Sequence, residues 1–224
     1  MGQFFDRRAE TYNEHMQETV ASFDQFYASI AAPLPRTDRP LQILDLGCGT
    51  GLELAHIWRR VPNAQIVGID LSRGMLDELE AAYAQQRGQL RLCQESYLAM
   101  EMGSHRYDCI IAVMTLHHLK PDVKTGLYAR IHHALIPQGI YVEGDYVVSP
   151  EKEAALLERH RRLSGRLSGR LTGRLTETDR GSHHIDIPFS DATQRRLLRE
   201  AGFERVERIF QQGEATVYAA YPGA

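Results

Sequence analysis

The chain has 224 residues, of which 43% are hydrophobic and 25% charged, and its formal net charge is −3. This composition is ordinary for a globular protein and excludes disorder throughout the chain. The length suits one large α/β domain with appendages rather than two domains. A slightly negative net charge gives the chain as a whole no attraction to nucleic acid.

The sequence also disfavours a membrane protein and a disulfide-bonded protein. No run approaches the ~18 to 20 apolar residues that a membrane helix needs, and MGQFFDRRAE at the N-terminus lacks the apolar core of a leader peptide. We therefore expect a cytoplasmic protein without a membrane partner. Cys48, Cys93 and Cys109 form no CxxC pair, which predicts free thiols. Arginine outnumbers lysine 23 to 3, which favours a GC-rich bacterial genome.

Residues 6–32 have helical propensity, and from residue 41 to about 147 short β-type runs alternate with amphipathic helical stretches. This alternation is typical of βαβ units and a parallel sheet. Ser72 is an expected helix N-cap, and Gly88 is expected to end the same helix with positive φ. A further helix is expected to begin at Pro121. The expected strands are residues 41–46, 65–70, 90–94, 107–114 and 140–148.

The C-terminal part predicts an antiparallel hairpin, because ERVERIF and ATVYAAY are joined by the short connection QQGE. The whole chain, 1–224, is interpreted as a single domain. Its expected parts are an N-terminal helical lid (1–40), a cofactor-binding core (41–148), a cap or insertion (149–189) and a final helix with the hairpin (190–224).

The cap contains an arginine-rich segment, residues 159–180, with a local charge of +5. Within it, SGRL, SGRL and TGRL repeat over residues 164–175, and each glycine costs a helix roughly 1 kcal/mol relative to alanine, so no stable helix is predicted there. The segment could attract RNA phosphates or an anionic substrate. We favour a solvated insertion, because no RNA-binding module accompanies it.

The most informative stretch is DLGCGTG, residues 45–51, where a strand is expected to end and a helix to begin. Backbone N–H groups point at a ligand in such a loop. The glycines give GxGxG, and Leu52 stands where the dinucleotide fingerprint has its third small residue. Asp45 would repel a pyrophosphate, so a ligand with cationic groups is favoured. Asp70 follows at a distance that suits an NAD enzyme as well.

DLGCGTG resembles the first motif of the class I S-adenosylmethionine-dependent methyltransferases. Further segments resemble that family in the right order: FDRRAETY (5–12), GIDLSRGML (68–76), YDCIIAVMTLHHL (107–119) and LIPQGIYV (135–142). The resemblance implies an α/β fold with a doubly wound, mostly parallel seven-stranded sheet of order 3-2-1-4-5-7-6, a C-terminal antiparallel hairpin and an N-terminal helical lid. It also implies S-adenosylmethionine as cofactor and S-adenosylhomocysteine as product.

The resemblance assigns roles by position. The glycine loop would wrap the methionine part of the cofactor, Asp70 would accept hydrogen bonds from the ribose hydroxyls, and Leu71 and Met75 would pack on the adenine. Ser96 stands where an aspartate is usual, which leaves Glu95 or the Ser96 hydroxyl as candidates for the adenine contact. The implied cofactor-binding residues are Tyr12, Asp45, Gly47, Cys48, Gly49, Asp70, Leu71, Met75, Ser96, Tyr97 and Met114.

Candidate catalytic residues follow the fourth and fifth expected strands. His117 and His118 lie where the family's substrate pocket opens, and a histidine can take a proton from a hydroxyl or amine near neutral pH. Packing or orientation is the alternative role. Asp145, with Glu143, could orient substrate or cap its strand.

No metal is expected. The other adjacent histidine pairs, His132 with His133 and His183 with His184, point in different directions on a helix or strand, which is unsuited to holding one ion.

The sequence thus predicts methyl transfer from S-adenosylmethionine to a small-molecule acceptor, because the cap is short and most of the chain is acidic. A tRNA or rRNA methyltransferase that uses residues 159–180 is the first alternative. An NAD-dependent oxidoreductase and a non-catalytic cofactor-binding regulator are the others, since fold alone does not fix activity. The oligomeric state stays open.

Overall fold

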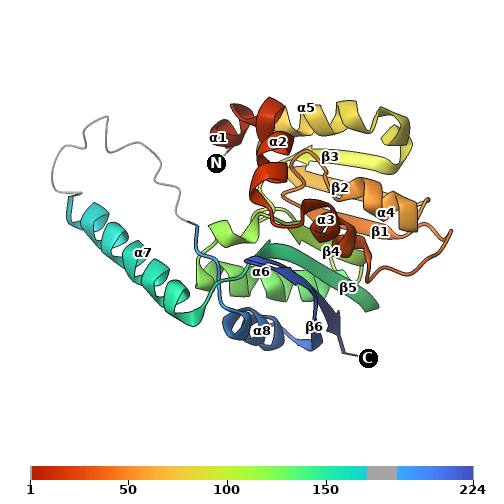
Figure 1. Cartoon of the computed structure of the whole chain (residues 1–224). Coiled ribbons are helices and arrows are strands. Elements are labelled where there is room, and N and C mark those ends of the chain that lie inside the picture. Colours follow the sequence, from red (N-terminus) through yellow and green to blue (C-terminus); the bar gives the residue numbers. More distant parts are fainter. Residues whose placement is uncertain (1, 171–185, 224) are drawn as a thin grey trace.

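The computed structural model describes residues 2–170 and 186–223 (Figure 1). They contain a seven-stranded sheet in the order β3-β2-β1-β4-β5-β7-β6, which confirms the predicted order. Strands β1 to β5 pair in parallel, and β7 pairs antiparallel with both β5 and β6. The strands are β1 (Gln42–Leu46), β2 (Gln65–Asp70), β3 (Leu90–Gln94), β4 (Tyr107–Val113), β5 (Leu135–Tyr146), β6 (Phe203–Gln212) and β7 (Ala215–Pro222).

Helices cover both faces of this sheet (Figure 1), as a doubly wound fold requires. Buried residues of α3, α4 and α5 pack on one face, and those of α6 and α8 pack on the other. The helices are α1 (Gly2–Asp6), α2 (Ala9–Thr19), α3 (Phe23–Ala31), α4 (Leu54–Arg60), α5 (Arg73–Ala82), α6 (Pro121–Ala134), α7 (Pro150–Arg170) and α8 (Asp191–Glu200), with short 3-10 segments η1 (Ala84–Gln89) and η2 (Leu116–His118).

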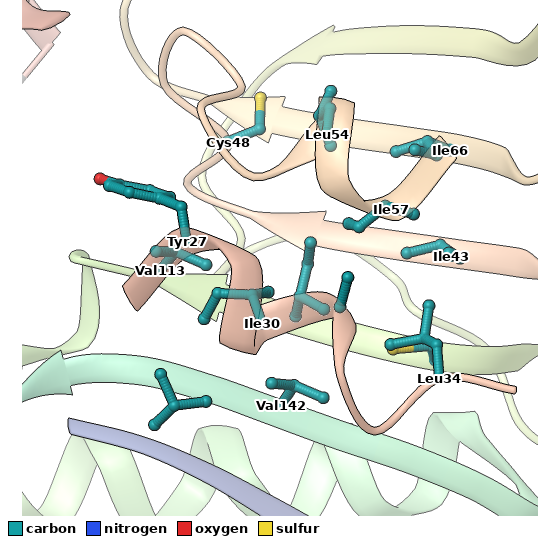
Figure 2. Packing of buried hydrophobic residues seen from close by; sticks show 14 of the residues in the cluster. Tyr27, Ile30, Leu34, Ile43, Cys48, Leu54, Ile57, Ile66, Val113 and Val142 are labelled. Carbon is teal, nitrogen blue, oxygen red and sulfur yellow. The ribbon is translucent and has the colours of Figure 1, made fainter. Parts of the chain in front are cut away.

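Part of the N-terminal region is core. Phe26 and Ile30 of α3, and Leu34 just after it, are completely buried. Figure 2 shows Ile30 and Leu34 among Ile43 of β1 and Val142 of β5. Burying a side chain of this size contributes about 1.5–3 kcal/mol, so α3 fixes the end of the N-terminal region to the sheet. Helices α1 and α2 lie at the carboxyl ends of β1 and β2, where Asp6 accepts a hydrogen bond from Ser72 Oγ and Asn13 accepts one from Thr50 Oγ1.

Strand β5 divides its side chains between the two faces. Ile140 and Val142 belong to the cluster under α3, whereas Tyr141 belongs to the cluster under α6 and α8. Because side chains alternate along a strand, Glu143 and Asp145 follow Tyr141 onto the α6 and α8 face. This alternation places two carboxylates behind the loop that follows β4.

Two local expectations were wrong. Helix α5 ends at Ala82, and Gly88 lies inside η1 without a positive φ, because the 3-10 segment continues the chain and needs no left-handed cap. Helix α7 runs through the first repeat and into the second, to Arg170. Extending an existing helix costs less than nucleating one, and Glu158 supports it through ion pairs with Arg161 and Arg162.

Helix α7 projects away from the body of the domain in Figure 1. The rest of the repeats (171–175), together with His183 and His184, lies outside the described residues. Within the ranges that the structure describes, no helix has both the length and the apolar character to cross a membrane.

Candidate active site

The glycine loop after β1 takes backbone conformations that side chains disfavour. Gly47, Gly49 and Gly51 have φ of +73°, +50° and +73°. A Cβ at position 47 would stand 2.5 Å from Thr115 Oγ1. Glycine is therefore required at position 47 by both its backbone angle and its close approach to the loop after β4.

Asp70 connects this loop to the second strand. Its Oδ2 accepts a hydrogen bond from Gly49 N at 3.0 Å, and its Oδ1 accepts one from Ser72 N at 2.8 Å. Ser72 Oγ in turn accepts from Met75 N, which confirms Ser72 as the N-cap of α5. Burial raises the pKa of Asp70 above its ordinary value. The carboxylate is thus held in one orientation before any ligand arrives.

Four N–H groups of the loop, those of Gly47, Cys48, Gly49 and Gly51, are already used within the protein. Gly47 N and Cys48 N donate to Ile69 O at 2.8 and 3.0 Å, and Gly51 N donates to Cys48 O at 2.8 Å. A phosphate-cradling loop needs such donors free to face the ligand. The arrangement therefore disfavours the pyrophosphate of a dinucleotide.

A cavity, here called the loop cavity, opens above the loop. The exposed side chain of Leu71 stands at its edge. Of the predicted cofactor-binding residues, it is lined by Tyr12, Gly47, Gly49, Asp70, Leu71, Met75, Tyr97 and Met114, and its lining also includes Phe5, Thr115 and His118. Phe5 and Thr115 were missed by the sequence analysis, although both stand inside the motifs that carried the resemblance.

Three predicted cofactor residues are not in this lining. Cys48 is buried, with its Sγ 2.9 Å from where a Cβ on Gly68 would lie. Ser96 Oγ accepts a hydrogen bond from Leu98 N in the turn after β3. Asp45 lies completely buried beneath the loop. Their contact with a cofactor stays a prediction.

Asp45 shares its buried space with Glu53. Both Asp45 oxygens and Glu53 Oε1 find no hydrogen-bond partner among the described residues. Burial raises the pKa of both carboxyls, and the neighbouring Glu53 raises that of Asp45 further. Burial therefore favours the protonated form of both carboxyls, and a cationic group of a ligand above the loop would favour the ionised form.

A second cavity, the histidine cavity, adjoins the first, since Phe5, Tyr12, Met114 and His118 line both. Met114 has a positive φ of 49°, a strained conformation for a side chain of this size, at the point where the two cavities meet. The lining of the histidine cavity is Phe4, Phe5, Arg8, Tyr12, His15, Met16, Met114, His117, His118, Tyr146 and Asp186.

His117 and Asp145, which the sequence placed separately, form a buried pair. His117 Nδ1 lies 2.5 Å from Asp145 Oδ1, and His117 N donates to Asp145 Oδ2 at 2.9 Å. Burial lowers the pKa of His117, but the Asp145 charge outweighs it and the pKa is raised. Burial raises the pKa of Asp145, and the His117 charge outweighs this to bring it to about 2. An ionised Asp145 only accepts, so Nδ1 of neutral His117 carries the proton and Nε2 has the lone pair.

Asp186 joins the two histidines. Its Oδ1 lies 3.9 Å from His117 Nε2 and 3.0 Å from His118 Nδ1. The sequence analysis missed Asp186, which lies 68 residues from His118. Among the described residues, His117, His118 and Asp186 each offer one possible metal-ligand atom, and these atoms lie within 4.8 Å of one another, a spacing that also suits a metal. Because the shortest distance is that of an ordinary hydrogen bond, we assign the group to hydrogen bonding.

Comparison with known proteins agrees with this geometry. Residues 43–139 match a family model described as a methyltransferase domain. The carboxy-S-adenosyl-L-methionine synthase of Wolinella succinogenes is 26% identical over 226 residues, which cover 98% of this chain and 93% of that protein. The enzyme of the same name from Campylobacter hominis is 25% identical over 184 residues, with coverage of 80% and 76%.

A solved structure supports the fold. DhpI in complex with SAH superposes with a TM-score of 0.67 at 16% identity, covering 99% of this chain and 94% of that one. The strand order and the glycine loop define a Rossmann-like α/β methyltransferase domain. The family-model match, the relatives and the shared fold together support a class I S-adenosylmethionine-dependent methyltransferase with S-adenosylmethionine as cofactor. The oxidoreductase alternative and the non-catalytic alternative are set aside.

Proposed function

We propose that this enzyme methylates a hydroxyl group on a small aromatic acceptor bound in the histidine cavity, with His117 as the general base. The observation that carries the proposal is the orientation of His117. Its Nδ1 is bound to Asp145, and the ring lines a cavity that adjoins the predicted cofactor site. The cofactor, when bound, supplies an electrophilic methyl group on a sulfonium.

The proton balance of this step is simple. The acceptor hydroxyl gives its proton to Nε2 of His117 as the oxygen–methyl bond forms and the sulfur–methyl bond breaks, leaving S-adenosylhomocysteine. Asp145 stabilises the resulting imidazolium, as its low pKa allows. The remaining work of the protein is to hold the acceptor in line with the methyl group.

The lining favours a ring-shaped acceptor. Phe4, Phe5, Tyr12 and Tyr146 present aromatic side chains to the cavity, beside the sulfur of Met114. Aromatic and thioether side chains attract aromatic rings beyond the area that they bury. Arg8, whose guanidinium lies 4.4 Å from the Phe4 ring centroid, adds a cation that suits an acidic substituent on that ring.

The nucleic-acid alternative is less well supported. Arg161 and Arg162 of α7 are paired with Glu158, and α7 projects from the body (Figure 1). The histidine cavity itself is lined by one arginine and by Asp186, which would repel phosphate. A small molecule suits this lining better than RNA.

A second candidate function comes from the relatives. Their alignment over nearly the whole chain favours formation of carboxy-S-adenosyl-L-methionine, in which the cofactor itself becomes the product. Arg8, as the arginine of the histidine cavity, would then hold the incoming carboxyl group. The two candidates differ in the mass of the cofactor-derived product.

The test uses S-adenosylmethionine with an isotopically labelled methyl group and mass spectrometry of all products. The acceptor panel contains hydroxylated aromatic compounds, aliphatic alcohols, amines and tRNA. The proposal expects S-adenosylhomocysteine and a labelled methyl ether from the aromatic hydroxyl compounds, and a rate lowered by about 10²- to 10⁴-fold in His117→Gln. Labelled RNA, or a carboxylated cofactor, would establish the corresponding alternative instead. A chelator in parallel reactions tests the hydrogen-bonding assignment of Asp186, which expects no loss of rate.

A further inference from the structure

A buried ion pair lies behind the histidine cavity and has no role in the steps above. Lys124 Nζ of α6 lies 2.9 Å from Glu143 Oε1 of β5, and the two side chains are 2% and 1% exposed. Removing two charges from water costs several kcal/mol per ion, which attraction repays only when the remaining hydrogen bonds are made. The stability of the fold does not by itself account for such a pair.

The pair is surrounded by hydrogen bonds, although Glu143 Oε1 itself has only its ion-pair contact with Lys124 and no hydrogen bond among the described residues. Lys124 Nζ donates to Gln194 Oε1 at 3.0 Å and lies 5.0 Å from the centroid of the Phe189 ring. Glu143 Oε2 accepts from Tyr128 OH at 2.6 Å, Tyr141 OH at 2.9 Å and Gln194 Nε2 at 2.9 Å. The network therefore locks β5, α6 and α8 together at one point.

That point is next to the His117–Asp145 pair. Glu143 and Asp145 are two residues apart on β5 and share its α6 and α8 face. The ionised carboxylates of Glu143 and Asp145, together with the Lys124 ammonium, leave one net negative charge. Protonation of His117 neutralises that charge. The Lys124 charge acts on both members of the pair, favouring ionised Asp145 and opposing protonated His117.

Other titratable groups also face His117. They are Asp145 and Tyr146 from β5, His118 from η2, Asp186 from the segment before α8, and Tyr12, Arg8 and His15 across the cavity from the N-terminal helices. All of these stay unchanged when Lys124 or Glu143 is replaced, so a change at either residue isolates the effect of the buried pair.

We propose that Lys124 and Glu143 are positioning residues for methyl transfer: their buried ion pair holds Asp145 in place and sets the charge that His117 faces as it gains and loses a proton. The inference rests on the proposed role of His117 as general base. On this inference the buried charges, despite their unfavourable desolvation free energy, serve catalysis rather than folding.

The two replacements have opposite expected effects. Lys124→Met removes a positive charge, so His117 holds its proton more tightly and its pKa rises. Glu143→Gln leaves the lysine charge in excess, so the pKa of His117 falls. Each shift is expected to be about 1 unit, the lower end of what a nearby charge produces. The double variant restores the balance of charge and should bring the midpoint back toward that of the wild type.

The experiment records the midpoint of the His117 ring by NMR titration of the full chain, with the signal assigned by comparison with His117→Gln. The pH dependence of kcat is measured in parallel. Tyr141→Phe is the control that keeps both charges and removes one hydrogen bond, and it should lower kcat without moving the midpoint. If a single variant does not fold, the His117 midpoint can still be compared between the double variant, in which the balance of charge is restored, and Tyr141→Phe, in which it is unaltered.

Midpoints that move in the same direction in both single variants, or a double-variant midpoint more than 1 unit from that of the wild type, would overturn the inference. Failure of the proposed function gives a different result. In that case His117→Gln keeps the wild-type kcat, while the NMR midpoints still report whether Lys124 and Glu143 set the charge at His117.

Discussion

Asp145 holds His117 at two points, accepting from its backbone N–H at 2.9 Å and lying 2.5 Å from its ring Nδ1. The first contact fixes the η2 turn, and the second fixes the ring within it. A third bond, from Tyr146 N to Asp145 Oδ1 at 2.8 Å, keeps the carboxylate itself from rotating. One buried side chain thus sets the direction in which the histidine faces the cavity.

Replacing Asp145 with asparagine should therefore lower kcat by about 10²- to 10⁴-fold, the range that general base catalysis contributes. The amide has nearly the same shape but cannot stabilise an imidazolium. Affinity for S-adenosylhomocysteine should change little, because Asp145 is not in the lining of the loop cavity. Initial rates and calorimetric titration measure the two effects. Asp24→Asn, at an exposed position, is the matched control, and a wild-type kcat in Asp145→Asn would exclude the proposed role.

The pH dependence of the rate follows from the raised pKa of His117. The base form accumulates only above that value, so kcat/KM, which reports the free enzyme, should rise through a midpoint above 6.5, the ordinary value for histidine. A plot of log kcat/KM against pH for wild type and His117→Gln checks this. An acidic limb that persists unchanged in the variant would mean that another group is titrating.

Stability should depend on pH in a matching way. Protonated His117 is favoured in the folded state, so its contribution is complete below the unfolded pKa and is lost as pH rises through the folded one. The contribution of Asp145 is present above its unfolded pKa and is lost as pH falls toward about 2. The free energy of unfolding of wild type relative to His117→Gln should thus be larger at pH 5 than at pH 9. Equal differences at both pH values would contradict the ion pair.

Asp45 offers a test beneath the glycine loop. A carboxyl whose pKa is raised by burial keeps its proton in the folded state, so stability falls as pH rises from the unfolded pKa toward the folded one. Asp45→Asn removes this loss of stability. The thermal midpoint of the variant minus that of the wild type should therefore be larger at pH 8 than at pH 5. Its affinity for S-adenosylhomocysteine should fall, because an amide cannot ionise in response to a cationic group of the ligand above the loop. A variant equally destabilised at both pH values would show that the ionised carboxylate has a stabilising partner.

Asp70→Asn should weaken binding of S-adenosylhomocysteine by about 10- to 100-fold, which corresponds to ~1.5–3 kcal/mol for hydrogen bonds to a charged group. The carboxylate that accepts from Gly49 N and Ser72 N would lose half of its acceptor capacity. Asp77→Asn on α5 is the control, since its exposed ion pair with Arg73 contributes little. Calorimetry on both variants makes the comparison, and equal affinities would remove Asp70 from the cofactor site.

Two glycines give a matched pair for the loop. Gly47→Ala should destabilise the protein by about 1–3 kcal/mol, the cost of a strained backbone conformation, and should abolish cofactor binding because its Cβ meets Thr115. Gly88→Ala has open space and no positive φ, so it should be neutral or stabilising by about 0.4–1 kcal/mol. Denaturant unfolding with and without S-adenosylhomocysteine compares them. Similar losses in both would show that the loop does not require glycine.

Much of the fold follows from local sequence. The apolar runs of β1 to β5 and the Ser72 cap predicted strands and helix starts close to those observed, because each depends on residues that are near in the chain. The antiparallel closure of β6 and β7 was equally local. Where a local rule failed, as in α7 and at Gly88, neighbouring structure outweighed the preference of single residues.

By itself the sequence determined the class of fold, the glycine loop and a set of residues near it, because strand periodicity, glycine spacing and motif order are all written along the chain. Only the tertiary structure decided which distant side chains meet. Asp145 reaches His117 across 28 residues, Asp186 reaches His118 across 68, and Lys124 and Glu143 become a buried pair. These contacts depend on how strands and helices pack, and no local pattern encodes the distance between two side chains on different elements.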